Sequence, residues 1–162
     1  MIVFIGPSGA GKSRLGKRVA RLLGVPFADT DKILIAEHGP IAQLFREHGQ
    51  GRFRELERAA VATALGGEGV LSLGGGAILD PDTQRDLAAH RVVFLTITPE
   101  AVAPRISGDA DRPLVKNGVQ DWVELNASRW AIYERLADAT FDTSHRPNDK
   151  LAEEVAAWLT TT

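Results

Sequence analysis

The sequence predicts a doubly wound α/β fold, with a parallel sheet of about five strands covered by helices on both faces. Three observations indicate this. Short apolar runs rich in β-branched residues recur along the chain, longer stretches with helical spacing separate them, and 162 residues suffice for one such domain and are few for two. The apolar runs span residues 2–5, 25–28, 70–73, 92–97 and 140–141.

These runs are nearly continuous in apolar residues, which is typical of parallel strands buried on both faces. After the first run, Leu15, Val19 and Leu22 fall at helical spacing, and Gly24 marks the end of that helix. The last part of the chain, residues 151–159, repeats the helical spacing. Strands and helices therefore alternate from one end of the chain to the other.

Two stretches interrupt this alternation. Residues 31–65 predict two or three helices, separated at Gly39-Pro40 and at Gly49-Gln50-Gly51. Residues 107–118 are polar, carry glycine near each end and predict a mobile loop. Because open α/β sheets bind ligands beyond the carboxyl ends of their strands, we expect both stretches to lie over that edge.

Composition and charge exclude several classes of protein. The formal net charge of −2 argues against a protein that coats nucleic acid or a membrane surface, because such proteins are usually basic. The absence of cysteine excludes disulfides and cysteine-ligated metals. No run approaches the roughly 18 apolar residues of a membrane span, and no basic leader precedes residues 2–5. We therefore expect a cytoplasmic monomer that binds neither nucleic acid nor membrane.

The strongest motif follows the first predicted strand. Residues 6–13 read GPSGAGKS and match G-x-x-x-x-G-K-[ST] in full, with a helical pattern after them. Glycines let successive N–H groups face a phosphate, and the helix start adds further donors. Lys12 can reach the β- and γ-phosphates, and Ser13 can ligate Mg²⁺. Arg14 stands where a dinucleotide-binding G-x-G-x-x-G needs its last glycine. The predicted nucleotide-binding residues are Gly9, Ala10, Gly11, Lys12, Ser13 and Arg14.

Acidic residues follow the second predicted strand, in the sequence Asp29-Thr30-Asp31. One carboxylate could hold Mg²⁺ through water, and the other could accept a hydrogen bond from a substrate hydroxyl. The alternative is that Asp29 or Thr30 caps the helix that starts near Lys32. Both interpretations stay open, and one residue could cap while another takes part in catalysis.

Three arginines are candidates for binding an anion. Arg54 and Glu57 are three residues apart on a predicted helix and form either a surface ion pair or an acid-oriented anion-binding arginine. Arg129 falls within the apolar stripe of the helix predicted from about residue 120 to 136, so its charge is paired with an acid or bound by a ligand. Arg112 lies in the predicted mobile loop, either solvated or closing over a transferred phosphate.

Three consecutive glycines, Gly74-Gly75-Gly76, follow the third predicted strand. They would let a ligand approach the backbone closely, although a flexible turn is the simpler interpretation. Their position at a strand's carboxyl end favours the ligand.

Taken in order, these motifs resemble the shikimate kinase family over nearly the whole chain. Apart from the phosphate loop each motif is weak, but their order and spacing together are specific. In sequence they are GPSGAGKS (6–13), DTD (29–31), Leu44-Phe45, Phe53-Arg54 with Glu57, LGGGA (73–77), RPL (112–114), Arg129 with Tyr133, and ADATFDT (137–143).

The resemblance implies a three-layer α/β/α P-loop kinase fold in a single domain, residues 1–162. Residues 31–65 would be the substrate-binding insertion and residues 107–118 the lid. It also implies an ATP- and Mg²⁺-dependent enzyme that transfers the γ-phosphoryl group of ATP to the 3-hydroxyl of shikimate. This reaction is a step of chorismate and aromatic amino-acid biosynthesis.

The resemblance also implies roles for individual residues. Asp31 would be the candidate base, while Lys12 and Arg112 would stabilise charge on the transferred group. Arg54, oriented by Glu57, would bind the shikimate carboxylate together with Arg129. The remaining acceptor-binding residues would be Phe45, Phe53, Gly74, Gly75 and Gly76. Arg105, Arg146 and Pro147 would sandwich adenine, and Ser13 with Asp29 would hold Mg²⁺.

The chain departs from the family pattern at three places. Arg14 replaces a threonine, Leu34-Ile35 replaces an Ile-Glu pair, and the segment around Gly39-Pro40 is shorter. Two other functions remain as alternatives. Another small-molecule kinase, such as a gluconate kinase, would lack the combination of residues 74–76 and 112–114. An ATP-binding sensor without turnover would have little use for Asp31 and the three arginines.

Overall fold

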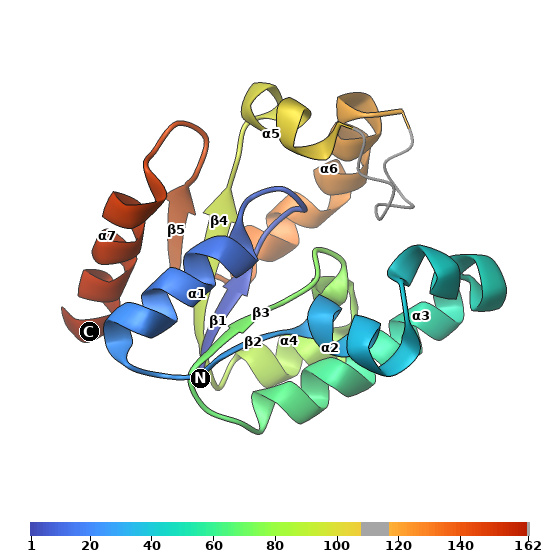
Figure 1. The fold of residues 1–162 in the computed structure, drawn as a ribbon, viewed down its shortest axis with the longest axis horizontal. Coiled ribbons are helices and arrows are strands. Elements are labelled where there is room, and N and C mark those ends of the chain that lie inside the picture. Colours follow the sequence, from blue (N-terminus) through green and yellow to red (C-terminus); the bar gives the residue numbers. More distant parts are fainter. Residues whose placement is uncertain (108–116, 162) are drawn as a thin grey trace.

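The computed structural model describes residues 1–107 and 117–161, which form a parallel five-stranded sheet between two layers of helices (Figure 1). The strand order is β2-β3-β1-β4-β5, and each neighbouring pair is parallel. The predicted doubly wound α/β fold is therefore confirmed. The strands are β1 (Ile2–Ile5), β2 (Phe27–Asp29), β3 (Val70–Ser72), β4 (Arg91–Thr96) and β5 (Ala139–Asp142).

Helices bury both faces of this sheet, which explains why the strands are nearly continuous in apolar residues. In β1, Phe4 packs into the cluster on one face, while Val3 and Ile5 pack into the cluster on the other. The first face is covered by α1 (Lys12–Leu23) and α7 (Asn148–Thr161). The opposite face is covered by α3 (Ile41–Leu65), α4 (Pro81–Leu87) and α6 (Val119–Leu136).

The second strand begins later than the sequence predicts, at Phe27 rather than at Val25. The backbone N–H of Val25 is used to close helix α1, since it donates to the carbonyl of Ala20 at 3.0 Å. Pro26 has no N–H to give to a sheet. Pairing therefore starts at Phe27, opposite Val70 of β3. The predicted helix stop at Gly24 is confirmed, because Gly24 adopts a left-handed conformation there.

The predicted insertion forms two helices, α2 (Thr30–His38) and α3, beside the edge strand β2 (Figure 1). They meet around a small apolar cluster that includes Leu34, Leu44 and Phe53. The break predicted around Gly49 is a kink inside α3, since Gly49 has a φ of 76°. The two helices of the predicted insertion therefore share a small apolar core of their own.

The carboxyl ends of the strands gather the predicted motifs at one edge. The phosphate loop (residues 6–13) leaves β1, whose neighbours β3 and β4 lie on opposite sides of it. That point is the topological switch at which open α/β sheets bind ligands. The 3₁₀ turn η1 (Ala77–Leu79) follows β3, and α5 (Pro99–Ile106) follows β4. Most of the predicted lid, residues 108–116, lies outside the described residues.

Within the described part of the chain, no helix combines the length and the apolar character needed to cross a membrane.

Candidate active site

The phosphate loop adopts a conformation that needs its glycines. Gly6, Gly9 and Gly11 have positive φ angles of 138°, 84° and 85°. The side chain of Lys12 is buried and lies across the loop, where its Nζ donates to the carbonyls of Gly6 at 2.8 Å and Pro7 at 3.0 Å. The loop and its lysine therefore form a compact cationic cradle at the start of α1.

Asp29 both caps a helix and contacts the phosphate loop. Its Oδ1 accepts from the backbone N–H groups of Asp31 at 3.0 Å and Lys32 at 3.3 Å, which confirms the capping interpretation. Its Oδ2 accepts a hydrogen bond from the Ser13 hydroxyl. The Ser13 Oγ also lies 3.5 Å from the hydroxyl oxygen of Ser72. Carboxylate and hydroxyl oxygens are the hard ligands that Mg²⁺ prefers, so these residues fit that ion.

The predicted Arg54–Glu57 pair is an ion pair in a largely desolvated setting. Glu57 is only 3% exposed, and burial raises the pKa of its carboxyl, while the charge of Arg54 opposes that rise. The Arg54 Nε is buried and, among the described residues, has no hydrogen-bond partner. A weak surface ion pair is therefore excluded, and the guanidinium keeps donor capacity for a ligand.

An aromatic wall flanks this arginine. The rings of Phe45 and Phe53 are tilted against each other with centroids 4.6 Å apart. The Arg54 guanidinium carbon lies 5.2 Å from the centroid of Phe53. The geometry of an apolar wall beside Arg54 thus agrees with the arrangement that the family resemblance implies.

Arg129 is buried, as its place in the helical stripe predicts, but the stripe itself is shifted. Its buried members are Trp122, Asn126, Arg129 and Tyr133, while Leu125 is only partly buried. Burial lowers the pKa of the Arg129 guanidinium, against the raising effect of Tyr133. Within residues 1–107 and 117–161, no carboxylate comes within ion-pairing distance of Arg129. Among those residues, no salt bridge therefore accounts for the burial of the Arg129 charge.

Tyr133 is a site residue to which sequence reasoning assigned no role. Its hydroxyl donates to the carbonyl of Gly75 at 2.5 Å, and its ring stacks on Phe94 with centroids 5.1 Å apart. Burial raises the pKa of the Tyr133 hydroxyl to about 12, so it stays protonated and can donate. The sequence did indicate that Tyr133 lies beside Arg129, since residues four apart share one helix face.

The glycine run makes room for charged side chains. None of the three glycines has a positive φ, so space rather than backbone conformation requires them. A Cβ on Gly74 would lie 2.7 Å from the Asp31 Oδ1 and 2.8 Å from the Glu57 Oε1, and a Cβ on Gly76 would overlap the guanidinium of Arg54. The run therefore packs directly against three of the predicted acceptor-binding side chains.

One cavity of about 450 Å³ connects the nucleotide loop to the acceptor side. Its lining includes Lys12 and Ser13 of the loop and helix α1, together with Asp31 and Gly75. Ile35 also lines this cavity and is 46% exposed, although it stands where the family pattern has an acid. A nucleotide phosphate and a small hydroxylated acceptor could thus meet in a single space.

The predicted adenine-binding residues lie on α5 and just before α7. Arg105 donates to the carbonyl of Gly9 at 3.2 Å and to the carbonyl of Thr143 at 3.1 Å. Arg146 pairs with Glu154 of α7, and Pro147 directly precedes that helix. Arg14 is exposed. Arg112 lies outside the described residues.

Comparisons with known proteins find one family that matches nearly the whole chain. The family model for shikimate kinase matches residues 8–160. A shikimate kinase from Salinispora tropica is 44% identical over 161 residues, covering 97% of this chain and 96% of that protein. The structure of a shikimate kinase from Acinetobacter baumannii in complex with shikimate has a TM-score of 0.94 at 30% identity and covers 99% of this chain and 92% of that one.

A gluconokinase structure from Sinorhizobium meliloti is less similar, with a TM-score of 0.61 at 18% identity over 99% of this chain and 91% of that one. That likeness concerns the fold alone. By contrast, the family model matches residues 8–160, and the Salinispora tropica protein is 44% identical over 97% of this chain. The chain belongs to the shikimate kinase family.

Proposed function

We propose that this chain transfers the γ-phosphoryl group of ATP to the 3-hydroxyl of shikimate, giving shikimate 3-phosphate and ADP. One observation carries the proposal. Arg129 is buried and, among the described residues, has no carboxylate within ion-pairing distance. The partly buried Arg54 has an Nε without a described hydrogen-bond partner and packs against Gly76, next to Gly75 of the cavity that contains the phosphate loop. Such a pair is suited to a small acceptor that carries a carboxylate.

The arginines would act by orienting the acceptor. A carboxylate held by Arg54 and Arg129 fixes one end of a rigid ring, while Glu57 keeps the Arg54 guanidinium in place. Phe45 and Phe53 would cover the apolar part of the ring. Fixing the acceptor in this way turns a bimolecular step into an effectively unimolecular one.

Asp31 would receive the proton of the attacking hydroxyl. Its carboxylate lines the cavity, next to Gly74 and on the acceptor side of the phosphate loop. The hydroxyl oxygen forms the new P–O bond, the bond from the γ-phosphorus to the bridging oxygen breaks, and ADP leaves. Phosphoryl transfer depends mainly on such positioning and on charge stabilisation.

Lys12, the backbone N–H groups of the phosphate loop and Arg112 would stabilise charge on the transferred group. Mg²⁺, held by Ser13 and through water by Asp29, would neutralise phosphate charge when bound. Arg105, Arg146 and Pro147 would flank the adenine ring. We further propose that the chain acts as a cytoplasmic monomer in the synthesis of chorismate and aromatic amino acids.

The decisive test measures ADP release from purified protein with ATP and Mg²⁺, in the presence of shikimate, gluconate or no acceptor. We expect ADP release that depends on shikimate, and no release with the methyl ester of shikimate, which lacks the carboxylate. Release that depends on gluconate would establish the rival kinase. ATP binding without turnover on either acid would establish the sensor.

A further inference from the structure

The phosphate loop is held from outside by three side chains from three different elements. The carbonyl of Ser8 accepts from the Trp122 Nε1 at 2.9 Å, that of Gly9 from Arg105, and that of Ala10 from the Thr143 hydroxyl at 2.9 Å. These donors come from α6, α5 and the end of β5. Three consecutive loop carbonyls are therefore fixed by groups that do not belong to the loop.

Fixing a carbonyl also fixes the N–H on the other side of the same peptide plane. In a trans peptide the C=O of one residue and the N–H of the next point in opposite directions. The chain has no cis peptide within the described residues, so the Trp122 bond that turns the Ser8 carbonyl toward α6 turns the Gly9 N–H away from it. Gly9 lines the cavity, where an inward N–H can bind a phosphate.

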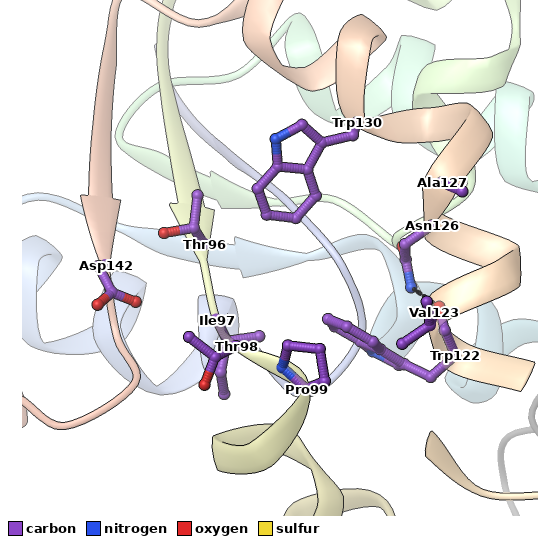
Figure 2. Close-up of a pocket in the computed structure, with 10 residues that line it drawn as sticks. All are labelled: Thr96, Ile97, Thr98, Pro99, Trp122, Val123, Asn126, Ala127, Trp130 and Asp142. Carbon is purple, nitrogen blue, oxygen red and sulfur yellow. Dashed lines mark hydrogen bonds between the residues drawn. The ribbon is translucent and has the colours of Figure 1, made fainter. Parts of the chain in front are cut away.

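The Trp122 ring packs in the apolar core of one sheet face and also borders a pocket. The residue is 3% exposed, yet it also lines a second, mostly apolar pocket of about 460 Å³ between α6 and the ends of β4 and β5 (Figure 2). Figure 2 shows the side chain of Asn126 turned toward the backbone of Trp122, whose carbonyl accepts from the Asn126 amide at 2.7 Å. The indole N–H bond to Ser8 is thus the directional contact of a ring whose other described contacts are mostly apolar.

We propose that Trp122 is a positioning residue for nucleotide binding, because its indole N–H holds the Ser8–Gly9 peptide in the orientation that a phosphate requires. The same helix carries Arg129, so α6 both fixes the phosphate loop and supplies the acceptor-binding arginine. The inferred effect of Trp122 on turnover rests on the proposed function, whereas the inferred effect of Trp122 on ADP binding does not.

The test compares Trp122→Phe with Trp130→Phe in the same helix. Trp130 also donates an indole hydrogen bond, but to the exposed Glu134 at 3.0 Å rather than to the phosphate loop. Calorimetry with ADP and Mg²⁺ measures the nucleotide Kd of each variant, and steady-state kinetics measures the KM for ATP and for shikimate. Because losing one hydrogen bond typically costs a few-fold to tenfold in affinity, we expect Trp122→Phe to raise the Kd for ADP and the KM for ATP by about three- to tenfold. We expect the KM for shikimate to stay within about twofold.

Three outcomes would overturn the inference: an unchanged Kd for ADP in Trp122→Phe, an equal loss in Trp130→Phe, or a rise in the KM for shikimate as large as that for ATP. If Trp122→Phe does not fold, replacing the indole of Trp122 by benzothiophene removes the N–H while keeping the bicyclic shape, and the same result is expected. A wild-type protein without shikimate-dependent turnover would contradict the proposed function, while the ADP comparison would still decide the role of Trp122.

Discussion

The nucleotide side and the acceptor side of the cavity are built on different principles. On the nucleotide side the binding groups are backbone N–H groups and one lysine, and the loop's carbonyls are satisfied by neighbouring side chains. On the acceptor side the proposed binding groups are charged side chains from α2, α3 and α6, of which Glu57 and Arg129 are buried. Among the described residues, side chains from neighbouring elements hold the carbonyls of the first region, whereas the second contains Arg129, which has no carboxylate within ion-pairing distance.

This difference bears on how each region responds to substitution. A loop shaped by backbone hydrogen bonds is preorganised. A substitution on this side should therefore reduce activity mainly when it removes the charge that the loop positions. A cluster of desolvated charges is sensitive to every member, because removing one leaves another buried without compensation. An anionic ligand that enters the cluster supplies the missing charge, so acceptor binding should stabilise the acceptor side more than the nucleotide side.

The largest effect is expected on the nucleotide side, from Lys12→Ala. This change removes the cation that lies across the loop and should lower kcat by about a thousandfold or more. Because the backbone N–H groups remain, ADP should still bind, with reduced affinity. Single-turnover kinetics and calorimetry with ADP separate the two effects. Activity retained by Lys12→Ala would refute the assignment of this lysine to charge stabilisation.

Arg129→Ala is expected to have the next largest effect, confined to the acceptor side. If Arg129 pairs with the acceptor carboxylate as proposed, its loss should lower kcat/KM for shikimate by about a hundredfold or more. ADP affinity should be unchanged. Arg135→Ala is the matched control, because Arg135 lies on the same helix but is exposed and bonds only to Gln84 among the described residues. Unchanged kinetics for shikimate in Arg129→Ala would refute the role of this arginine.

The same contrast explains which parts of the candidate site could be predicted from the sequence. The phosphate loop was predictable residue by residue because its function depends on backbone shape, which a short glycine motif encodes locally. The helical spacing predicted that Arg129 is a buried charge, but the sequence did not predict which side chains surround it. Tyr133 and Trp122 donate hydrogen bonds to carbonyls 58 and 114 residues away in sequence, and no local sequence pattern predicts such pairings.

The glycine run offers a way to disturb the acceptor side without removing a charge. A methyl group added by Gly76→Ala would overlap the Arg54 guanidinium, which must then move away from its place beside Glu57. We expect the KM for shikimate to rise by about ten- to a hundredfold, because small misplacements of a positioning group are costly. Gly51→Ala is the control, since a Cβ at Gly51 meets no atom within 4 Å. A normal KM for shikimate in Gly76→Ala would show that Arg54 does not need this position.

The smallest effect concerns the pH dependence of acceptor binding, through Glu57. Burial raises the pKa of this carboxyl above its ordinary value of 4.5, so the folded protein holds the proton more tightly than the unfolded chain does. Protonation therefore contributes stability below the unfolded pKa, and this contribution is lost as the pH rises through the raised folded value. Activity follows the opposite direction, because a neutral Glu57 no longer pairs with Arg54. As the pH falls through the raised value, the KM for shikimate should increase by about tenfold.

Glu57→Gln should remove this pH dependence, leaving a KM for shikimate that is raised at neutral pH and nearly flat across the acidic range. Glu55→Gln is the control, because Glu55 lies on the same helix and pairs with Arg52 at the exposed surface. Its KM profile should match that of the wild type, since screened surface pairs contribute little. If Glu57→Gln kept the full acidic rise in KM, the titrating group would be another carboxylate, such as Asp31 or that of the acceptor. The buried pair would then orient Arg54 without setting the pH range in which the enzyme binds its acceptor.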